Sequence, residues 1–145
     1  MASDRSYVLD ASVGIKLLVA ETGSDKVDSI FDAFAQNLDT RLYVPTLFFV
    51  ECANVLWKIA RRGQRKVEDI PEDIESLIGL ALDRLDILPL MPDAMRLALE
   101  HDISVYDATY AAAARACGVP LLTADERLAK RLAGSDVEVV TLGSL

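Results

Sequence analysis

The chain has few of the residues that build zinc sites. Its 145 residues include one histidine, His101, and two cysteines, Cys52 and Cys117. Structural zinc sites use three or four Cys and His ligands at characteristic spacing, and these three residues form no such cluster. Both cysteines fall inside helical patterns, so we expect free, buried thiols rather than a disulfide.

Long apolar runs and a secretion signal are also absent. No apolar run reaches the roughly 18 residues that a membrane span needs. The first ten residues, MASDRSYVLD, lack the basic segment, long apolar region and cleavage site of a signal peptide. With 52% hydrophobic and 26% charged residues, the composition is that of a globular protein. We therefore expect a single cytoplasmic domain over residues 1–145, with no membrane segment.

Positive charge is scarce. The chain has 15 Lys and Arg against 23 Asp and Glu, which gives a formal net charge of -8 and an isoelectric point near 4.6. Non-specific binding of nucleic acid generally needs a basic surface, so the composition alone argues against it. A cluster of acids that holds divalent cations would account for part of the excess of negative charge.

Short apolar segments alternate with helical patterns along the chain. Strands are predicted at 7–9, 42–44, 87–90, 121–123 and 137–141. Helices are predicted at 13–21 after a Ser12 cap, from Ser24 through Phe34, at 47–62 after a Thr46 cap, at 71–82, from Pro92 through Ala98, from Asp107 across an Ala-rich segment, and at 126–133 after an Asp125 cap. This alternation implies right-handed crossovers and a parallel sheet covered on both faces. We predict a three-layer α/β/α domain with four to five strands.

Four acids fall at comparable places in this pattern. Asp10 ends the first strand, Glu51 lies early in the helix after the second, Asp107 begins a helix, and Asp125 follows the fourth strand. The carboxyl ends of parallel strands share one edge of the sheet, so we expect the four side chains to converge. Taken alone, Asp107 and Asp125 are more simply explained as helix caps. Glu51 is flanked by core residues and needs a partner of another kind.

Clustered carboxylates favour a metal ion. Two like charges about 4 Å apart repel by roughly 4 kcal/mol at an effective dielectric of 20, so they need a cation or must take up protons. Oxygen ligands suit Mg²⁺ or Mn²⁺, which can activate a water and stabilise charge on a phosphoryl group. The reaction class predicted from this chemistry is phosphodiester hydrolysis. Asp10, Asp107 and Asp125 would hold the metal, with Glu51 as a ligand or water-orienting base.

Four segments carry a resemblance to a known family. They are VLDASV at 8–13, PTLFFVECANVL at 45–56, SVYDATY at 104–110 and LLTADERL at 121–128. Together they resemble the four acidic motifs of PIN-domain ribonucleases, most closely the VapC toxins of toxin–antitoxin pairs, over nearly the whole chain. The resemblance implies a metal-dependent endoribonuclease, commonly homodimeric and inhibited by a cognate antitoxin that inserts a segment at the active site. The middle of the chain, 63–92, carries no family signature.

The resemblance also assigns residues. Asp10, Glu51, Asp107 and Asp125 match the acidic quartet. Ser12, Asn54 and Thr123 match the polar positions that support it. No motif position departs from the family pattern. Two other classes that place Asp after a first strand do not fit: haloacid-dehalogenase-type phosphatases have a second Asp where this chain has Ser12, and the late Lys and early acidic pair of receiver domains are absent.

The helix after the second strand offers a path for RNA. At 100° per residue, Asn54, Lys58, Arg61 and Arg62 fall in one stripe that begins near Glu51, and Arg65 and Lys66 extend it. The opposite face is predicted to be apolar and comprises Phe49, Val50, Ala53, Leu56 and Trp57. Phosphates would lie along the stripe toward the metal. The alternative is a solvated helix face whose basic end complements the helix dipole.

Two further functions stay open at this point. The first is a catalytically silent PIN-fold module that binds RNA or protein, which a missing acid would favour, whereas all four acids are present. The second is a nuclease for DNA or structured flaps, but such enzymes carry an added helical arch for which the chain is short. Tyr106 and Tyr110 are expected in the core rather than on RNA bases.

Overall fold

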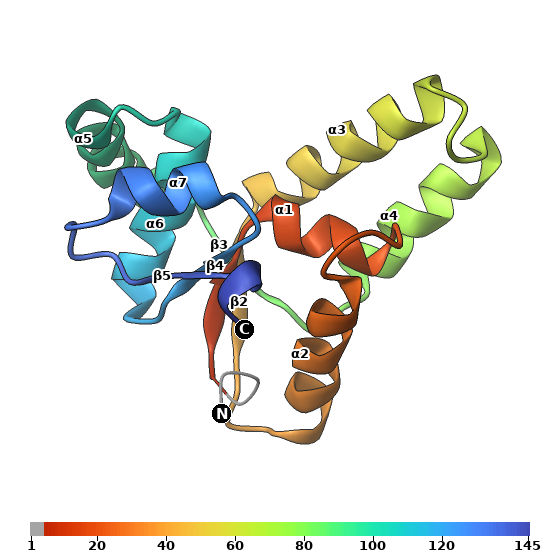
Figure 1. Cartoon of the computed structure of the whole chain (residues 1–145), viewed down its shortest axis with the longest axis horizontal. Helices are drawn as coiled ribbons and strands as arrows, with labels where there is room; N and C mark the ends of the chain where they lie inside the picture. The colour runs from red at the N-terminus through yellow and green to blue at the C-terminus, as the bar shows by residue number, and fades with distance from the viewer. Residues whose placement is uncertain (1–4) are drawn as a thin grey trace.

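Residues 5–145 are described by the computed structural model, which forms one parallel sheet with helices on both sides (Figure 1). The strands are β1 (Tyr7–Leu9), β2 (Leu42–Pro45), β3 (Asp83–Leu85), β4 (Leu121–Thr123) and β5 (Val139–Thr141). The α-helices are α1 (Ala11–Gly14), α2 (Ser24–Gln36), α3 (Leu47–Arg61), α4 (Ile70–Ile78), α5 (Met91–His101), α6 (Val105–Cys117) and α7 (Glu126–Leu132). Short 3-10 turns are η2 (Ile15–Leu17), η3 (Val67–Asp69), η4 (Leu88–Leu90) and η5 (Leu142–Ser144).

The strand order is β3-β2-β1-β4-β5, and every pair is parallel. β1 lies at the centre, where Val8 is aligned with Tyr43 on one side and Leu121 on the other. Its three residues are fully buried, as the continuous apolar pattern of a doubly covered parallel strand predicts. The chain first builds outward from β1 through β2 to β3 and then returns to the other side with β4. The strand order therefore reverses between β1 and β4, which is where parallel sheets open a crevice for ligands.

The Ala-rich helix α6 packs directly on the sheet. It contacts β1, β2 and β4, while α5 packs against its other side (Figure 1). Residues 108–114 of α6 are all buried, five of them Ala. Small side chains allow this close approach, so the helix holds its first turn at a fixed height above the sheet edge. On the opposite side, α1 and α2 lie near the sheet, and α3 and α4 form a hairpin that projects away from it (Figure 1).

The predicted class is confirmed, but several boundaries were wrong. The third strand is Asp83–Leu85 rather than 87–90, because α4 ends at Ile78 and the next residues reach the edge of β2, where Pro45 pairs with Leu85. The segment around Pro89 turns into η4, since proline cannot donate to a sheet ladder. The last strand starts at Val139.

Only some of the predicted helix caps are confirmed. Asp125 caps α7 through its side chain as predicted. Ser12 lies inside α1, which spans four residues and continues as η2 rather than as a long helix. Thr46 precedes α3 without a side-chain cap, and Gly23, in the left-handed region at φ 91°, precedes α2. Among residues 5–145, no helix is both long and apolar enough to cross a membrane. Cys52 and Cys117 are free thiols as expected, but only Cys52 is buried, whereas Cys117 is half-buried.

Candidate active site

The structure brings the four predicted acids into one cavity of about 630 Å³. Asp10 directly follows β1 and Asp125 lies just after β4, so these two flank the point where the strand order reverses. Glu51 comes from α3 and Asp107 from the first turn of α6. The lining also includes Ser12, Asn54, Lys58 and Tyr106. Acids from four separate elements thus share one site at the carboxyl edge of the sheet.

Hydroxyl groups hold Asp10 in place. Its Oδ2 accepts hydrogen bonds from Thr123 Oγ1 at 2.7 Å and from Ser12 Oγ at 2.9 Å. Ser12 Oγ in turn accepts from the backbone N–H of Ala124, and Thr123 Oγ1 accepts from that of Asp125, both at 3.0 Å. The two hydroxyls therefore join the loop after β1 to the loop after β4. Ser12 serves this network instead of capping a helix.

Glu51 is the least satisfied of the acids. Among residues 5–145, neither its buried Oε1 nor the Tyr110 hydroxyl beside it forms a hydrogen bond of ordinary geometry, although the hydroxyl is near enough to interact with the carboxylate. Burial raises the pKa of Glu51, the Tyr110 hydroxyl partly opposes that rise, and the charges of Asp10 and Asp107 add to it. A buried carboxylate oxygen without a well-formed hydrogen bond is costly, so this oxygen is suited to bind a cation.

Asp107 and Asp125 differ in how they relate to their helices. Ser104, not Asp107, caps α6, because Ser104 Oγ accepts from the Asp107 backbone N–H at 3.1 Å. The cap interpretation of Asp107 is therefore wrong. Asp125 Oδ1 accepts from the N–H groups of Arg127 and Leu128 at 3.0 and 3.1 Å, so it caps α7 while also lining the cavity.

Burial and neighbouring acids raise the pKa values of Asp10 and Asp107. The pKa of Asp10 is raised, first by burial and then by the Asp125 charge, against the opposing hydrogen bonds from Thr123 and Ser12. The pKa of Asp107 is raised by burial and by the charges of Asp10 and Asp125. This mutual repulsion is what a bound cation relieves. The donor set, all carboxylate oxygens with one buried oxygen unpartnered, fits a hard divalent ion.

The carboxylates are gathered but not closed into a ligand cage. Within residues 5–145, no three Asp, Glu, His or Cys side chains lie close enough together to hold a metal ion as they stand. Binding would therefore require the carboxylates to draw inward.

A cysteine beneath the site is excluded as a nucleophile. Cys52 is buried, with Sγ 4.0 Å from the Ala11 carbonyl oxygen. Burial, followed by the charges of Glu51 and Asp10, raises the pKa of its thiol to about 12. At neutral pH the group is a thiol, and the thiolate is the reactive form.

The predicted RNA stripe divides along α3. Asn54 and Lys58 line the acid cavity. The Arg61 guanidinium instead lies 5.1 Å from the centre of the Trp57 ring, in a separate cavity of about 380 Å³ between α3 and α4. Arg62 is exposed and lines neither cavity. Arg65 donates to Asp73 at 2.6 Å and so does not extend the stripe.

Three cavity residues escaped the sequence interpretation. Tyr106 was expected in the core, yet it is 62% exposed and lines the acid cavity, whereas Tyr110 is fully buried as expected. Val50 was placed on an apolar buried face, yet it is 68% exposed and lines the same cavity. Arg127, on the other side of the acids, was not considered. Its place two residues after Asp125 was the available signal.

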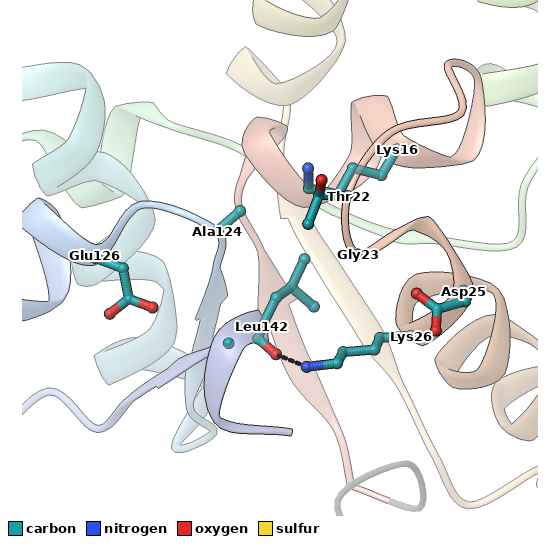
Figure 2. A pocket seen from close by; sticks show the side chains of 9 residues that line it. Lys16, Thr22, Gly23, Asp25, Lys26, Ala124, Glu126 and Leu142 are labelled. Atoms are coloured by element: carbon teal, nitrogen blue, oxygen red, sulfur yellow. Dashed lines mark hydrogen bonds between the residues drawn. The ribbon is translucent and has the colours of Figure 1, made fainter.

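A second depression, near α2, is lined by none of the four acids of the candidate site (Figure 2). It has about 470 Å³ and lies between Lys16 and Lys26 on one side and Glu126 on the other. Its cations are already engaged, because Lys26 Nζ donates to the Leu142 carbonyl oxygen at 3.0 Å and Lys16 pairs with Glu21 at 2.8 Å. The acid cavity is therefore the better candidate for chemistry.

We predict that Tyr110→Phe leaves the metal-free protein as stable as the original, or stabilises it by up to about 1 kcal/mol. The substitution removes a buried hydroxyl that forms no hydrogen bond of ordinary geometry among residues 5–145, and it keeps the packing of the ring. We also expect weaker Mn²⁺ binding, because this hydroxyl is the group beside Glu51. Thermal unfolding and calorimetric titration measure both. Tyr110→Leu, which leaves a cavity, is the destabilised control, and a loss above about 1 kcal/mol in the Phe variant would contradict the prediction.

Comparison with known proteins places the chain in a family. Residues 7–134 match the family model described as PIN domain. The chain is 37% identical over 126 residues to ribonuclease VapC3 of Pyrobaculum aerophilum, which covers 86% of this chain and 92% of that protein. It is 32% identical over 101 residues to exonuclease VapC9 of the same organism, with coverage of 69% and 74%.

A solved structure agrees on the fold. A toxin–antitoxin complex from Klebsiella pneumoniae superposes with a TM-score of 0.64 at 17% identity, covering 94% of this chain and 98% of that one. The family match spans most of the chain and includes all four acids at the carboxyl edge of the sheet. This chain therefore belongs to the PIN-domain family, and within it the chain is similar to the VapC ribonucleases.

Proposed function

We propose that this protein is a metal-dependent endoribonuclease and the toxin of a toxin–antitoxin pair. The observation that carries the proposal is the meeting of Asp10, Glu51, Asp107 and Asp125 in one cavity, with a buried Glu51 oxygen that lacks a donor. The similarity to ribonuclease VapC3 supports RNA as the substrate. A catalytically silent module would have no use for four clustered carboxylates, three of which, Asp10, Glu51 and Asp107, have pKa values raised by burial and by neighbouring acids.

The chemistry follows from the donors. Asp10, Asp107, Asp125 and Glu51 would hold Mg²⁺ or Mn²⁺, and a bound ion of this kind activates water and stabilises charge on a phosphoryl group. Ser12 and Thr123 keep Asp10 oriented through their hydrogen bonds. Glu51, whose pKa burial raises, is suited to accept a proton from the attacking water.

Three further residues of the cavity, Asn54, Lys58 and Tyr106, are suited to RNA. Lys58 supplies a positive charge for a phosphate beside the acids. The exposed ring of Tyr106 at the rim can stack on a base. Asn54 lies one turn beyond Glu51 on the same cavity wall and supplies an amide for hydrogen bonding to the substrate or to Glu51.

The proposed partners are an antitoxin and a second copy of the chain. The structural likeness to a toxin–antitoxin complex supports the antitoxin. The family resemblance implies the second copy, and the cytoplasm is the compartment that we propose. Exposed apolar side chains on α3 and α5, among them Trp57 and Leu99, offer surface for such contacts. Size-exclusion chromatography with light scattering, with and without the product of an adjacent reading frame, tests the two assemblies.

We expect cleavage of single-stranded RNA with added Mg²⁺ or Mn²⁺ and none in excess chelator. Panels of RNA and DNA separate a ribonuclease from a DNA nuclease, and cleavage of neither would favour the silent module. A circular single-stranded RNA separates internal from terminal cleavage, a needed distinction because one relative is named an exonuclease. Conversion of the circle to a linear product supports the proposal, whereas a circle that survives while linear RNA is degraded would replace it with an exonuclease.

A further inference from the structure

The acids have a second cavity on their far side. This smaller space of about 170 Å³ is lined by Asp107, Asp125, Arg127 and Arg131, with residues 102–104 and Leu128. Asp107 and Asp125 line both this cavity and the larger one that contains Lys58. The two spaces therefore meet at these carboxylates, with Lys58 of α3 in one and Arg127 of α7 in the other.

Lys58 and Arg127 are not neutralised by ion pairs within residues 5–145, although the protein is rich in acids. Many other basic side chains are paired, including Arg131 with Asp102 at 3.0 Å and Arg115 with Asp136 at 3.1 Å. Within residues 5–145, Lys58 and Arg127 take part in no ion pair. The Arg127 guanidinium is therefore available for an anion from outside the chain.

Helix stability does not account for Arg127. It lies in the first turn of α7, where the helix dipole disfavours a cation. Lys58, by contrast, lies in the last turn of α3, where a cation is favoured. A basic side chain kept at an unfavourable helix end, beside two carboxylates and unpaired, is better explained by a ligand that carries negative charge.

We propose that single-stranded RNA crosses the acid site from α3 to α7, with Lys58 and Arg127 binding phosphates on opposite sides of the bond that is cut. This inference rests on the proposed ribonuclease function. A phosphate chain that approaches several carboxylates is repelled by them, so it gains from a cation on each side. The path leaves α3 after Lys58 and does not follow the helix to Arg61, which lies against Trp57 in another cavity.

We expect Lys58→Gln and Arg127→Gln each to weaken RNA binding about three- to tenfold near physiological salt. Each lost phosphate contact should lower the slope of log K against log salt by about 0.7, the value for single strands. Because the two cations lie on different sides of the acids, their effects should multiply in the double variant. Both side chains are exposed, so the substitutions should leave folding intact.

Binding is measured by fluorescence anisotropy with a labelled single-stranded RNA, on full-length protein carrying Asp10→Asn to prevent cleavage. Lys130→Gln is the matched control, because Lys130 is exposed on α7, the helix that carries Arg127, and lines neither cavity. To test metal binding, each substitution is also made in protein that keeps Asp10. The rise in unfolding temperature on adding Mn²⁺ then shows whether metal binding has changed. The proposal expects weaker RNA binding by Lys58→Gln and Arg127→Gln, unchanged binding by Lys130→Gln, and a manganese shift retained in all three.

Several results would overturn the path. The path is rejected if Arg127→Gln binds RNA as tightly as the Asp10→Asn protein without further substitution. It is also rejected if Lys130→Gln weakens RNA binding as much as Arg127→Gln does, because that would indicate only a diffuse effect of charge. Weaker RNA binding by Arg61→Gln, with unchanged binding by Arg127→Gln, would instead support a phosphate path along α3. Cleavage of RNA by the unsubstituted protein tests the proposed function separately, so an active enzyme with an indifferent Arg127 refutes the path alone. Binding of an acidic peptide but not RNA, with the same variants affected, would assign the surface to a protein partner.

Discussion

Asp10→Asn should reduce RNA cleavage by at least about a thousandfold while the protein stays folded. Both hydroxyl donors, Ser12 and Thr123, bond to the same oxygen, Oδ2. The carbonyl oxygen of Asn can take that place and keep both hydrogen bonds, so the substitution removes charge but little structure. Cleavage rates at saturating Mn²⁺ measure the first effect, and circular dichroism with thermal unfolding measures the second.

The same variant separates metal binding from stability. A ligand that binds only the folded state raises the unfolding temperature, so Mn²⁺ should stabilise the original protein more than the Asn variant. Asp28→Asn, an exposed change on α2 away from the cavity, is the matched control and should respond as the original does. Full activity in Asp10→Asn, or activity of the original protein in excess chelator, would refute the metal mechanism.

A pH series on the metal-free protein gives an independent check. Asp10, Glu51 and Asp107 all have pKa values raised above their ordinary ones. Between the pKa values of the unfolded state and the higher pKa values of the folded state, the folded state binds more protons. The free energy of unfolding must therefore fall as pH rises through that window. We expect a higher unfolding temperature near pH 5 than near pH 7, with a smaller difference in Asp10→Asn. Saturating Mn²⁺ should reverse the trend, because metal binding favours the ionised carboxylates.

Gly14→Ala should destabilise the protein by about 3 kcal/mol, which corresponds to a fall of roughly 6–12 °C in unfolding temperature. A Cβ at Gly14 would lie 2.3 Å from Cζ and 2.4 Å from Cε2 of the Phe48 ring. Phe48 is fully buried, so its ring has little room to move. The backbone at Gly14 is ordinary helix, with φ -59°, and the penalty therefore comes from space alone. Denaturant and thermal unfolding measure the loss.

The clash should also reach the active site. Gly14 is in α1, which follows Asp10, while Phe48 is one turn before Glu51 in α3. Pushing these helices apart separates two members of the quartet, so cleavage should fall even where the variant is still folded. The double variant with Phe48→Leu should recover part of the stability, giving a favourable coupling in a double-mutant cycle. Gly79→Ala is the control, since its Cβ would meet only contacts of 3.4 Å or more, and equal losses at both glycines would contradict the steric argument.

Much of the site was predictable because it depends on local order along the chain. Short buried segments followed within two residues by an acid, at Asp10 and Asp125, identify strand ends without knowledge of the partner strands. The rule that parallel strands end at one edge then brings the acids together. The edge strand β3 was placed wrongly for the opposite reason. Its residues, Asp83 to Leu85, have no apolar pattern, and only pairing with β2 makes them a strand.

The sequence by itself determined the alternation of strands and helices, the parallel sheet and the edge at which the acids gather. Only the tertiary structure decided which side chains reach the cavity. Tyr106 and Tyr110 are one helical turn apart, yet one is exposed because the first turn of α6 extends past the core and the other is buried under the sheet. Arg61 turns to Trp57, and Arg127 of α7 reaches the far side of Asp107. Helical periodicity gives the direction of a side chain about its own axis, whereas burial depends on how far each helix projects from the sheet and on what lies across from it.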